Sequence, residues 1–332
     1  MDMGKSDEIQ TPIERTNTII AYDKHWQRPA ATEEAAYRSL HSVREPLGFA
    51  YYGLAWATLM DGLKTRTSKS TDILQALLQG QKTAALPSSE RRVTVAQHIR
   101  AINYFDLFEA LDITDVFWAH AVHSYQTSKG IRIHPFPLFP AQAPDYEGST
   151  PSEKRHLANF VGAYNPAIYL TNVREKIFED EGRFGDLHIV KRERWHFDRA
   201  VYDEQIAGRT ASESQLATEA QMKQDYLDAI RQSWFTLCPT GSGPNSIRIF
   251  ESLALGSIPI ILSRALHLAG PSDLWERAAI IEEDSEDGYR RAVERARRTS
   301  NAERLEMMAA GKTLFDHVGP GGYAGIIQQA LA

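Results

Sequence analysis

Apolar and polar residues alternate in a regular order along the second half of the chain. Short apolar runs predict strands at 157–162, 187–191, 234–238, 258–262 and 279–282. Apolar residues at helical spacing predict helices at 172–181, 221–232, 246–255, 273–277 and 286–298. Strands that alternate with helices in this way favour a doubly wound parallel sheet. Two further helices, at 302–317 and 323–331, end the chain.

The first half contains the same two kinds of segment, with longer polar stretches between them. Strands are predicted at 18–22, 92–97 and 116–120, and helices at 33–43, 48–63, 72–78 and 104–111. The segment 48–63 is apolar and aromatic enough to predict a buried helix. Residues 134–144 contain four prolines and predict an extended crossing rather than a helix or a central strand.

A domain boundary is predicted just after this proline-rich stretch, where residues 145–152 are polar and turn-like. We expect an N-terminal domain over 1–145, a C-terminal domain over 150–318 and a terminal helix within 319–332. A chain of 332 residues is long enough for two domains of this size.

The loop at 240–245 is the stretch with the clearest chemistry. It holds two glycines and a proline, and a predicted helix starts directly after it, with Ser246 as its N-cap. Glycines let the backbone come close to a ligand, and free amides at a helix start attract phosphate. Arg248 could add a charge-assisted contact, and Glu251, one turn on, could accept hydrogen bonds from sugar hydroxyls. A tight turn followed by a surface arginine and glutamate would look the same.

This region resembles the signature of the exostosin-like glycosyltransferases. The matching residues are Leu237-Cys-Pro-Thr-Gly-Ser-Gly, Ser246-Ile-Arg-Ile-Phe-Glu251 and Gly256-Ser-Ile-Pro-Ile-Ile. The resemblance implies an α/β fold of the GT-B type, with two Rossmann-like domains that face each other across a cleft. It also implies a nucleotide-sugar donor and, for most members, inverting transfer without a metal. In this fold the end of the chain often crosses back to the first domain, as residues 319–332 could do.

The resemblance also points to donor-binding residues. Within the signature these are Gly241, Ser242, Gly243, Asn245, Ser246, Arg248 and Glu251. Two more lie upstream. Gly162 matches the glycine that follows the first strand of the family's donor domain, and Arg174 matches the arginine at the next helix and would contact phosphate. A surface role for Arg174 is an open alternative.

Composition limits the class of protein. The formal charge of -6 argues against nucleic acid as the main partner, and 42% hydrophobic residues are ordinary for a globular protein. The single cysteine, Cys238, excludes an intramolecular disulfide. The first fifteen residues are polar, and the sequence contains no run of eighteen apolar residues. We expect a cytoplasmic enzyme of surface-polysaccharide or lipopolysaccharide assembly, with a carbohydrate or glycolipid acceptor and, at most, peripheral contact with a membrane.

An inverting transferase needs a base for the acceptor hydroxyl. Predicted strands in the first half end near His25, His98, His120 and His123. Because the carboxyl edge of a parallel sheet faces the ligand, we predict that the base is His98, Asp23 or His120, with His98 first. Imidazole suits the task since its ordinary pKa lies near neutral pH. The sequence has no Asp-x-Asp motif, so we expect neither a metal nor another cofactor.

Two other classes of protein fit the same fold. One is another enzyme, a nucleotide-sugar epimerase or a phosphorylase. The other is a non-catalytic assembly subunit that keeps the donor-domain fold. The sequence has no P-loop of the form GxxxxGK[ST], which disfavours a kinase.

Overall fold

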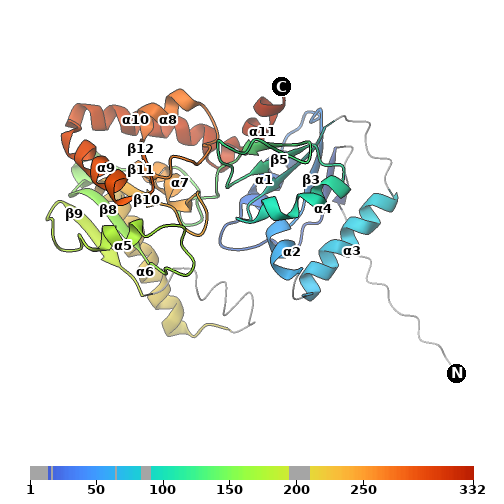
Figure 1. Ribbon diagram of the computed structural model, residues 1–332, viewed down its shortest axis with the longest axis horizontal. Coiled ribbons are helices and arrows are strands. Elements are labelled where there is room, and N and C mark those ends of the chain that lie inside the picture. The colour runs from blue at the N-terminus through green and yellow to red at the C-terminus, as the bar shows by residue number, and fades with distance from the viewer. Residues whose placement is uncertain (1–13, 16–17, 64–65, 84–90, 194–209) are drawn as a thin grey trace.

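Two β-sheets, one mostly and one wholly parallel, organise the two halves of the structure (Figure 1). The computed structural model describes residues 14–15, 18–63, 66–83, 91–193 and 210–332. Within these residues the first sheet has seven strands and the second has five. Helices cover both sheets, so the predicted α/β class is confirmed.

The strands of the first sheet cross it in nearly the order in which they occur along the chain. Its order is β1-β2-β3-β4-β5-β7-β6, and β2, β3, β4, β5 and β7 are parallel. The two-residue strands β1 and β6 pair antiparallel at the edges. The strands are β1 (Glu14–Arg15), β2 (Ile19–Ala21), β3 (Ala50–Gly53), β4 (Arg92–Ala96), β5 (Asp115–Trp118), β6 (Thr127–Ser128) and β7 (Ile131–Pro135).

Helices pack on both faces of this sheet because successive strand residues point to opposite sides. Ile19 and Ala21 join a core with α1 (Thr32–His41) and the C-terminal helix α11 (Tyr323–Leu331). Ile20 and Tyr22 point to the other core. That core is closed by α2 (Trp56–Gly62), α3 (Ser68–Thr83), the 3-10 turn η1 (Ala101–Tyr104) and α4 (Phe105–Ala110).

The second sheet is doubly wound, as predicted. Its parallel order is β12-β11-β10-β8-β9, so the direction of winding reverses between β8 and β10. The strands are β8 (His156–Gly162), β9 (Leu187–Lys191), β10 (Ser233–Pro239), β11 (Ile258–Leu262) and β12 (Ile280–Glu282). A short 3-10 turn, η2 (Pro151–Glu153), precedes β8.

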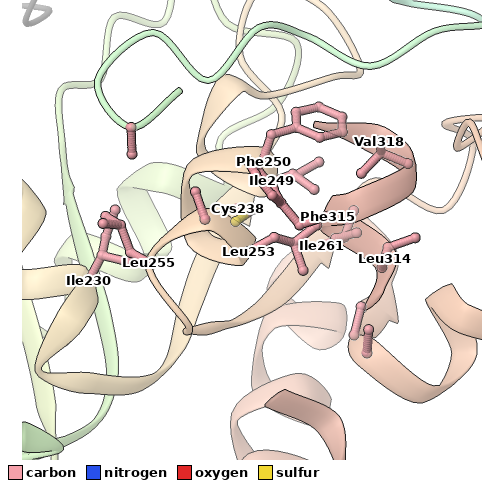
Figure 2. Close-up of a cluster of buried hydrophobic side chains, with 14 of the residues drawn as sticks. Ile230, Cys238, Ile249, Phe250, Leu253, Leu255, Ile261, Leu314, Phe315 and Val318 are labelled. Carbon is pink, nitrogen blue, oxygen red and sulfur yellow. The ribbon is translucent and has the colours of Figure 1, made fainter. Parts of the chain in front are cut away.

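Six helices flank the second sheet in the described part of the chain. One face carries α5 (Val173–Phe178) and α9 (Glu286–Arg298). The other carries α6 (Glu213–Arg231), α7 (Ile247–Ala254), α8 (Ser272–Ala278) and α10 (Asn301–Val318), which ends at the turn η4 (Pro320–Gly322). Figure 2 shows Phe250 and Leu253 of α7 in one cluster with Leu314 and Phe315 of α10. This burial fixes α7, the helix that carries Arg248.

The carboxyl ends of the two sheets face each other. Residues that follow β5 form an isolated antiparallel bridge, Val122 to Leu266, with residues that follow β11. The bridge is supported by hydrogen bonds from the amide of His123 to the Ala265 carbonyl (3.1 Å) and from the amide of His267 to the Ala121 carbonyl (2.9 Å).

The C-terminal helix joins the two halves at a second place. In Figure 1, α11 lies beside the first half, and its Tyr323 and Ile327 are buried in the core that contains α1. The amide of Ala324 donates to Oγ of Ser39 in α1 (3.1 Å). The domain limits predicted from the sequence stay a prediction.

Most predicted elements occur where expected, and one prediction was wrong. Residues 48–63 form the strand β3 followed by the helix α2 instead of one buried helix. A short apolar run does not distinguish a buried strand from a buried helix by its periodicity. The paired aromatic residues Tyr51 and Tyr52 favour a strand, and both are buried in the sheet. The extended stretch at 134–144 also begins inside a strand, β7, which the sequence analysis did not predict.

No helix in the described part of the chain is both long enough and apolar enough to cross a membrane.

A buried glutamate ties three elements of the first half together. Glu33 of α1 is 2% exposed, and its carboxyl group accepts hydrogen bonds from the amides of Ala57 in α2 (3.2 Å) and Gln97 after β4 (2.9 Å). Its own amide donates to Oε1 of Gln97 (3.1 Å). Burial raises the pKa of Glu33 to about 8, although the three backbone amides of Gln97, Ala57 and Trp56 oppose the shift.

This raised pKa predicts a pH-dependent stability. The folded state holds the Glu33 proton up to about pH 8, whereas the unfolded chain releases it at a lower pH, near the ordinary pKa of a glutamate. The free energy of unfolding should therefore fall as pH rises through this interval and level off above it. Urea unfolding of the wild type and Glu33→Gln at several pH values measures the effect. The advantage of the wild type over the variant should shrink as pH rises, and parallel curves would contradict the assignment. Glu276→Gln, on the exposed side of α8, is the control.

Candidate active site

The carboxyl ends of β8 and β10 lie where the strand order of the second sheet reverses. From β8 the chain first adds β9 on one side and then returns to place β10 on the other. In α/β proteins, ligands bind outside the carboxyl ends of the strands at such a reversal. Gly162 ends β8 and Pro239 ends β10, so the segments 163–172 and 240–245 border this point.

Two arginines reach this point from different helices. Arg174 of α5 donates from Nε to the carbonyl of Thr240 (2.9 Å) and from Nη1 to that of Ala163 (3.1 Å). Arg248 of α7 donates from Nη2 to the carbonyl of Val161 (2.8 Å). These carbonyls belong to the ends of β8 and β10 or to the residues directly after them. The sheet therefore fixes both side chains, and it brings the predicted pair together.

Aromatic rings surround the two guanidinium groups. The ring of Phe160 lies 5.6 Å from Cζ of Arg174 and 4.7 Å from Cζ of Arg248. Tyr169 adds a second ring at 4.2 Å from Arg174, and Tyr226 adds one at 5.8 Å from Arg248. The faces of these rings attract the cations without consuming their N–H donors.

In the part of the chain that the structure describes, no carboxylate forms an ion pair with either arginine, and Nε of Arg248 is buried with no partner. Burial, followed by the charge of Arg248, lowers the pKa of Arg174 to about 10, which still leaves it charged at neutral pH. Two charged donors that form no direct ion pair with a described carboxylate are suited to an anion.

Glycine at position 162 is explained by the closeness of these side chains. A Cβ on Gly162 would lie 3.2 Å from Nη2 of Arg248 and 3.2 Å from the ring of Phe160. At Gly241 a Cβ would meet Nη2 of Arg174 only at 3.7 Å, which is ordinary contact. The carbonyl of Gly241 accepts from the amide of Leu170 (3.0 Å), so the two segments at the switch point are bonded to each other.

The start of α7 is capped differently from the prediction. Ser246 takes the N-cap position, but its hydroxyl makes no capping bond. Instead Oδ1 of Asn245 accepts from the amide of Ser246 (2.8 Å). The amide group of Asn245 donates to the carbonyl of Ala119 in the other half (2.6 Å). Ser242, earlier in the loop, is half-buried.

His120 lies under this loop rather than open to an acceptor. It is 5% exposed, and its Nδ1 accepts a long hydrogen bond from the amide of Asn245 (3.4 Å). Burial, together with the charge of His98, lowers the pKa of His120 to about 3. The ring is therefore neutral at physiological pH, and the structure uses it to join the two halves.

Glu251 is engaged within the protein at both carboxylate oxygens. It is 2% exposed; Oε1 accepts from the amide of Gln142 (3.0 Å) and Oε2 from the hydroxyl of Tyr226 (2.6 Å). Burial raises the pKa of Glu251, and the bonds from Tyr226 and Gln142 oppose this. Glu251 thus connects α7 with α6 and with the segment between the sheets. Its contact with sugar hydroxyls stays a prediction.

His98 follows β4, as predicted, and is paired with Asp61 of α2. The distance from Nε2 of His98 to Oδ1 of Asp61 is 3.0 Å. Nδ1 of His98 accepts from the amide of Arg100 (3.1 Å), so Nε2 carries the proton and donates it. Ile99, the next residue, would touch a Cβ placed on Gly243, at 2.9 Å. This pair therefore lies beside the loop of the second half.

The remaining candidates lie elsewhere at the carboxyl edge of the first sheet. Asp23 follows β2, and its Oδ1 accepts from Nε1 of Trp26 (2.7 Å) and from Nη2 of Arg38 (2.9 Å). His25 pairs with Asp72 of α3 at 3.0 Å, and His123 packs on His267 with ring centroids 4.7 Å apart. The four histidines thus have four different environments. The catalytic roles predicted for Asp23, His98 and His120 stay predictions.

Sequence analysis missed two acidic residues of this edge, Glu33 and Asp61. Both lie in helices whose sequence carries no motif, and their partners come from distant segments. The aromatic neighbours of the arginines were missed for the same reason, since Phe160 and Tyr226 look like ordinary core residues of a strand and a helix.

Comparison with known proteins identifies the family. The exostosin GT47 domain matches residues 94–286, which is more than half of the chain. The chain therefore belongs to the exostosin GT47 family. This is a family of glycosyltransferases, and the two α/β halves of the chain agree with the two-domain fold that the resemblance implies.

Individual similar proteins are more distant. Human ribitol-5-phosphate xylosyltransferase 1 is 31% identical over 93 residues, which are 28% of this chain and 19% of that protein. An alpha-glucosyltransferase solved with UDP-glucose and DNA containing an abasic site has a TM-score of 0.49 and 12% identity, covering 94% of this chain and 90% of the other. Anabaena Alr3699/HepE, solved with UDP and glucose, has a TM-score of 0.47 and 9% identity, covering 95% and 98%. These similarities are too low to bear on the roles of single residues.

The close contact at Gly243 leads to a prediction. A Cβ there would lie 2.6 Å from Nδ1 of His120 and 2.9 Å from Cγ2 of Ile99, and the buried His120 has little room to move. Gly243→Ala should lower the free energy of unfolding by about 1–3 kcal/mol, the range for overpacking. Urea unfolding measures this change. Gly241→Ala is the matched control, because its Cβ has room and neither glycine has a positive φ. Equal stability of the two variants would show that the halves are not in contact at Gly243.

Proposed function

We propose that the protein transfers a sugar from a nucleotide-sugar donor to a carbohydrate acceptor, and that the donor's diphosphate binds between Arg174 and Arg248. The observation that carries this proposal is the pair of charged guanidinium groups at the β8–β10 switch point, held by carbonyls and rings, with no carboxylate of the described residues at ion-pair distance. A nucleoside diphosphate supplies the negative charges that this pair lacks. The loop 240–245 and the start of α7 contribute backbone amides to the same ligand.

The same pair supplies catalysis. When the sugar leaves, negative charge grows on the departing diphosphate, and donors already in place stabilise it in the transition state more than in the ground state. Because Arg174 and Arg248 are fixed by the ends of the strands, little reorganisation is needed at that moment. This is the task that a divalent cation performs in other transferases, so we propose metal-independent transfer.

The stereochemistry and the acceptor are part of the proposal. We propose direct displacement with inversion, in which the acceptor hydroxyl attacks from the side of the first sheet. The acceptor is a cell-surface polysaccharide or a glycolipid. The name of the human relative, which pairs xylose with a polyol phosphate, supports a hydroxyl-rich acceptor.

A screen of nucleotide sugars with released nucleotide as the readout tests the reaction class. Release that depends on an acceptor supports the transferase. Isomerisation without an acceptor would indicate an epimerase, and failure to bind any donor would indicate an assembly subunit.

Removal of one arginine should weaken binding of a nucleoside diphosphate. Arg248→Ala loses a charge-assisted hydrogen bond, so the affinity should fall by roughly 1.5–3 kcal/mol. Titration calorimetry with UDP and GDP measures this. Arg298→Ala, an exposed arginine of α9 that pairs with Glu294, should bind as the wild type does. Unchanged affinity in Arg248→Ala would contradict the proposed site.

Chelation tests the proposed metal independence. Turnover should be retained in excess EDTA, because the arginines and helix amides carry the charge of the leaving group. Initial rates with and without EDTA, after dialysis against the chelator, are the measurement. Complete loss of activity that Mn²⁺ or Mg²⁺ restores would refute this part of the proposal.

A further inference from the structure

The carboxyl edge of the first sheet carries a polar cluster that the donor site leaves unexplained. Asp61 of α2 accepts from Nε2 of His98 at Oδ1 (3.0 Å) and from Nε2 of Gln27 at Oδ2 (2.6 Å). Gln27 follows β2 and His98 follows β4, so three separate segments meet at this carboxylate. His98 lies next in the chain to Ile99, which packs against Gly243 of the loop 240–245, the proposed donor loop.

The hydrogen bonds within this cluster decide which group can take a proton. The lone pair of His98 Nδ1 is occupied by the amide of Arg100, and the proton on Nε2 points to Asp61. In this arrangement His98 has no free acceptor. From the described residues, each oxygen of Asp61 receives one of the two or so hydrogen bonds that it can accept. The side chain of Asp61 is 58% exposed, against 12% for His98, so an incoming hydroxyl can reach the carboxylate more easily.

We propose that Asp61 is the catalytic base, that it receives the proton of the acceptor hydroxyl, and that His98 and Gln27 hold it in place. This inference rests on the transferase function proposed above. It differs from the prediction made from the sequence, in which His98 itself was the first candidate.

Proton transfer accompanies sugar transfer in the proposed step. The acceptor O–H bond breaks and its proton goes to a carboxylate oxygen of Asp61. The acceptor oxygen forms a bond to the anomeric carbon with its electron pair, while the bond from that carbon to the phosphate oxygen breaks. The departing electron pair stays on the diphosphate, beside Arg174 and Arg248. Asp61 returns its proton to solvent after the product leaves.

The surroundings of Asp61 suit this role. Burial alone would raise its pKa, but the bonds from His98 and Gln27 lower it, so the group is charged and ready before substrate binds. An acceptor that covers Asp61 removes water from the carboxylate. This loss of water raises the pKa of Asp61 toward the range useful for a base. Glu33 fixes the positions of both segments. It bonds α2, which carries Asp61, and it bonds Gln97, which precedes His98.

The other predicted candidates have competing contacts. Asp23 forms an ion pair with Arg38, and His120 is buried and bonded to the donor loop. The acceptor nitrogen of His120 is thus occupied, and the carboxylate of Asp23 is already paired with a cation, whereas Asp61 is held by His98 and Gln27.

Three variants in the full chain test the proposal with the donor and acceptor found in the screen. Asp61→Asn keeps the shape but not the basicity, so kcat should fall about 10²–10⁴-fold while donor affinity by calorimetry holds. His98→Gln can still donate to Asp61 and should lose about tenfold or less. Asp72→Asn is the matched control, since Asp72 is also paired with a histidine, His25, at 3.0 Å.

The pH profile separates the two candidate bases. If Asp61 is the base, the acid limb of kcat/KM for the wild type lies in the range of a carboxylate, and His98→Gln keeps that limb. An acid limb in the range of an imidazole, with a large loss in His98→Gln and a small one in Asp61→Asn, would overturn the proposal. Near-normal kcat in Asp61→Asn would do so as well. If no variant, including the wild type, binds a nucleotide, it is the proposed function that fails.

Discussion

Two positive charges share one end of a β-sheet in this protein, and much of the second half is arranged to hold them there. Arg174 and Arg248 come from helices on opposite faces of the sheet and meet at the ends of β8 and β10. Backbone carbonyls take up some of their donors, and the rings of Phe160, Tyr169 and Tyr226 surround the two guanidinium groups. Burial of α7 against α10 keeps Arg248 from moving away. Two positive charges held close together destabilise the free protein, and a bound anion would offset their repulsion.

The same region joins the two halves of the molecule. Asn245 bonds to Ala119, and Gly243 lies against His120 and Ile99, so the donor loop and the carboxyl edge of the first sheet are in direct contact. Glu251 bonds the segment between the sheets to α7 through Gln142. A change in the donor loop is therefore felt on the side where the acceptor is proposed to bind. This contact gives a structural reason for transfer to depend on both halves at once.

Local patterns in the sequence were sufficient to predict the strands and helices of the second half, and less so those of the first half. The strands β9 and β11 and the helix α9 begin and end at the predicted residues, because apolar runs alternate there with helical spacing. The prediction of one helix over 48–63 was wrong because the apolar residues there suit a strand as well as a helix. Candidate donor-binding residues such as Arg248 could be predicted from a motif. Asp61 and Glu33 could not be predicted in this way. Their hydrogen-bond partners lie 24 to 64 positions away in the sequence, and only the folded chain brings them together.

The proposed site for the donor's diphosphate lies between Arg174 and Arg248. A crystal structure of the protein with a bound nucleoside diphosphate tests it most directly. We predict phosphate oxygens within hydrogen-bond distance of both guanidinium groups, and a hydrogen-bond partner for Nε of Arg248. A diphosphate bound elsewhere, with both arginines still held only by the carbonyls of Val161, Ala163 and Thr240, would contradict it.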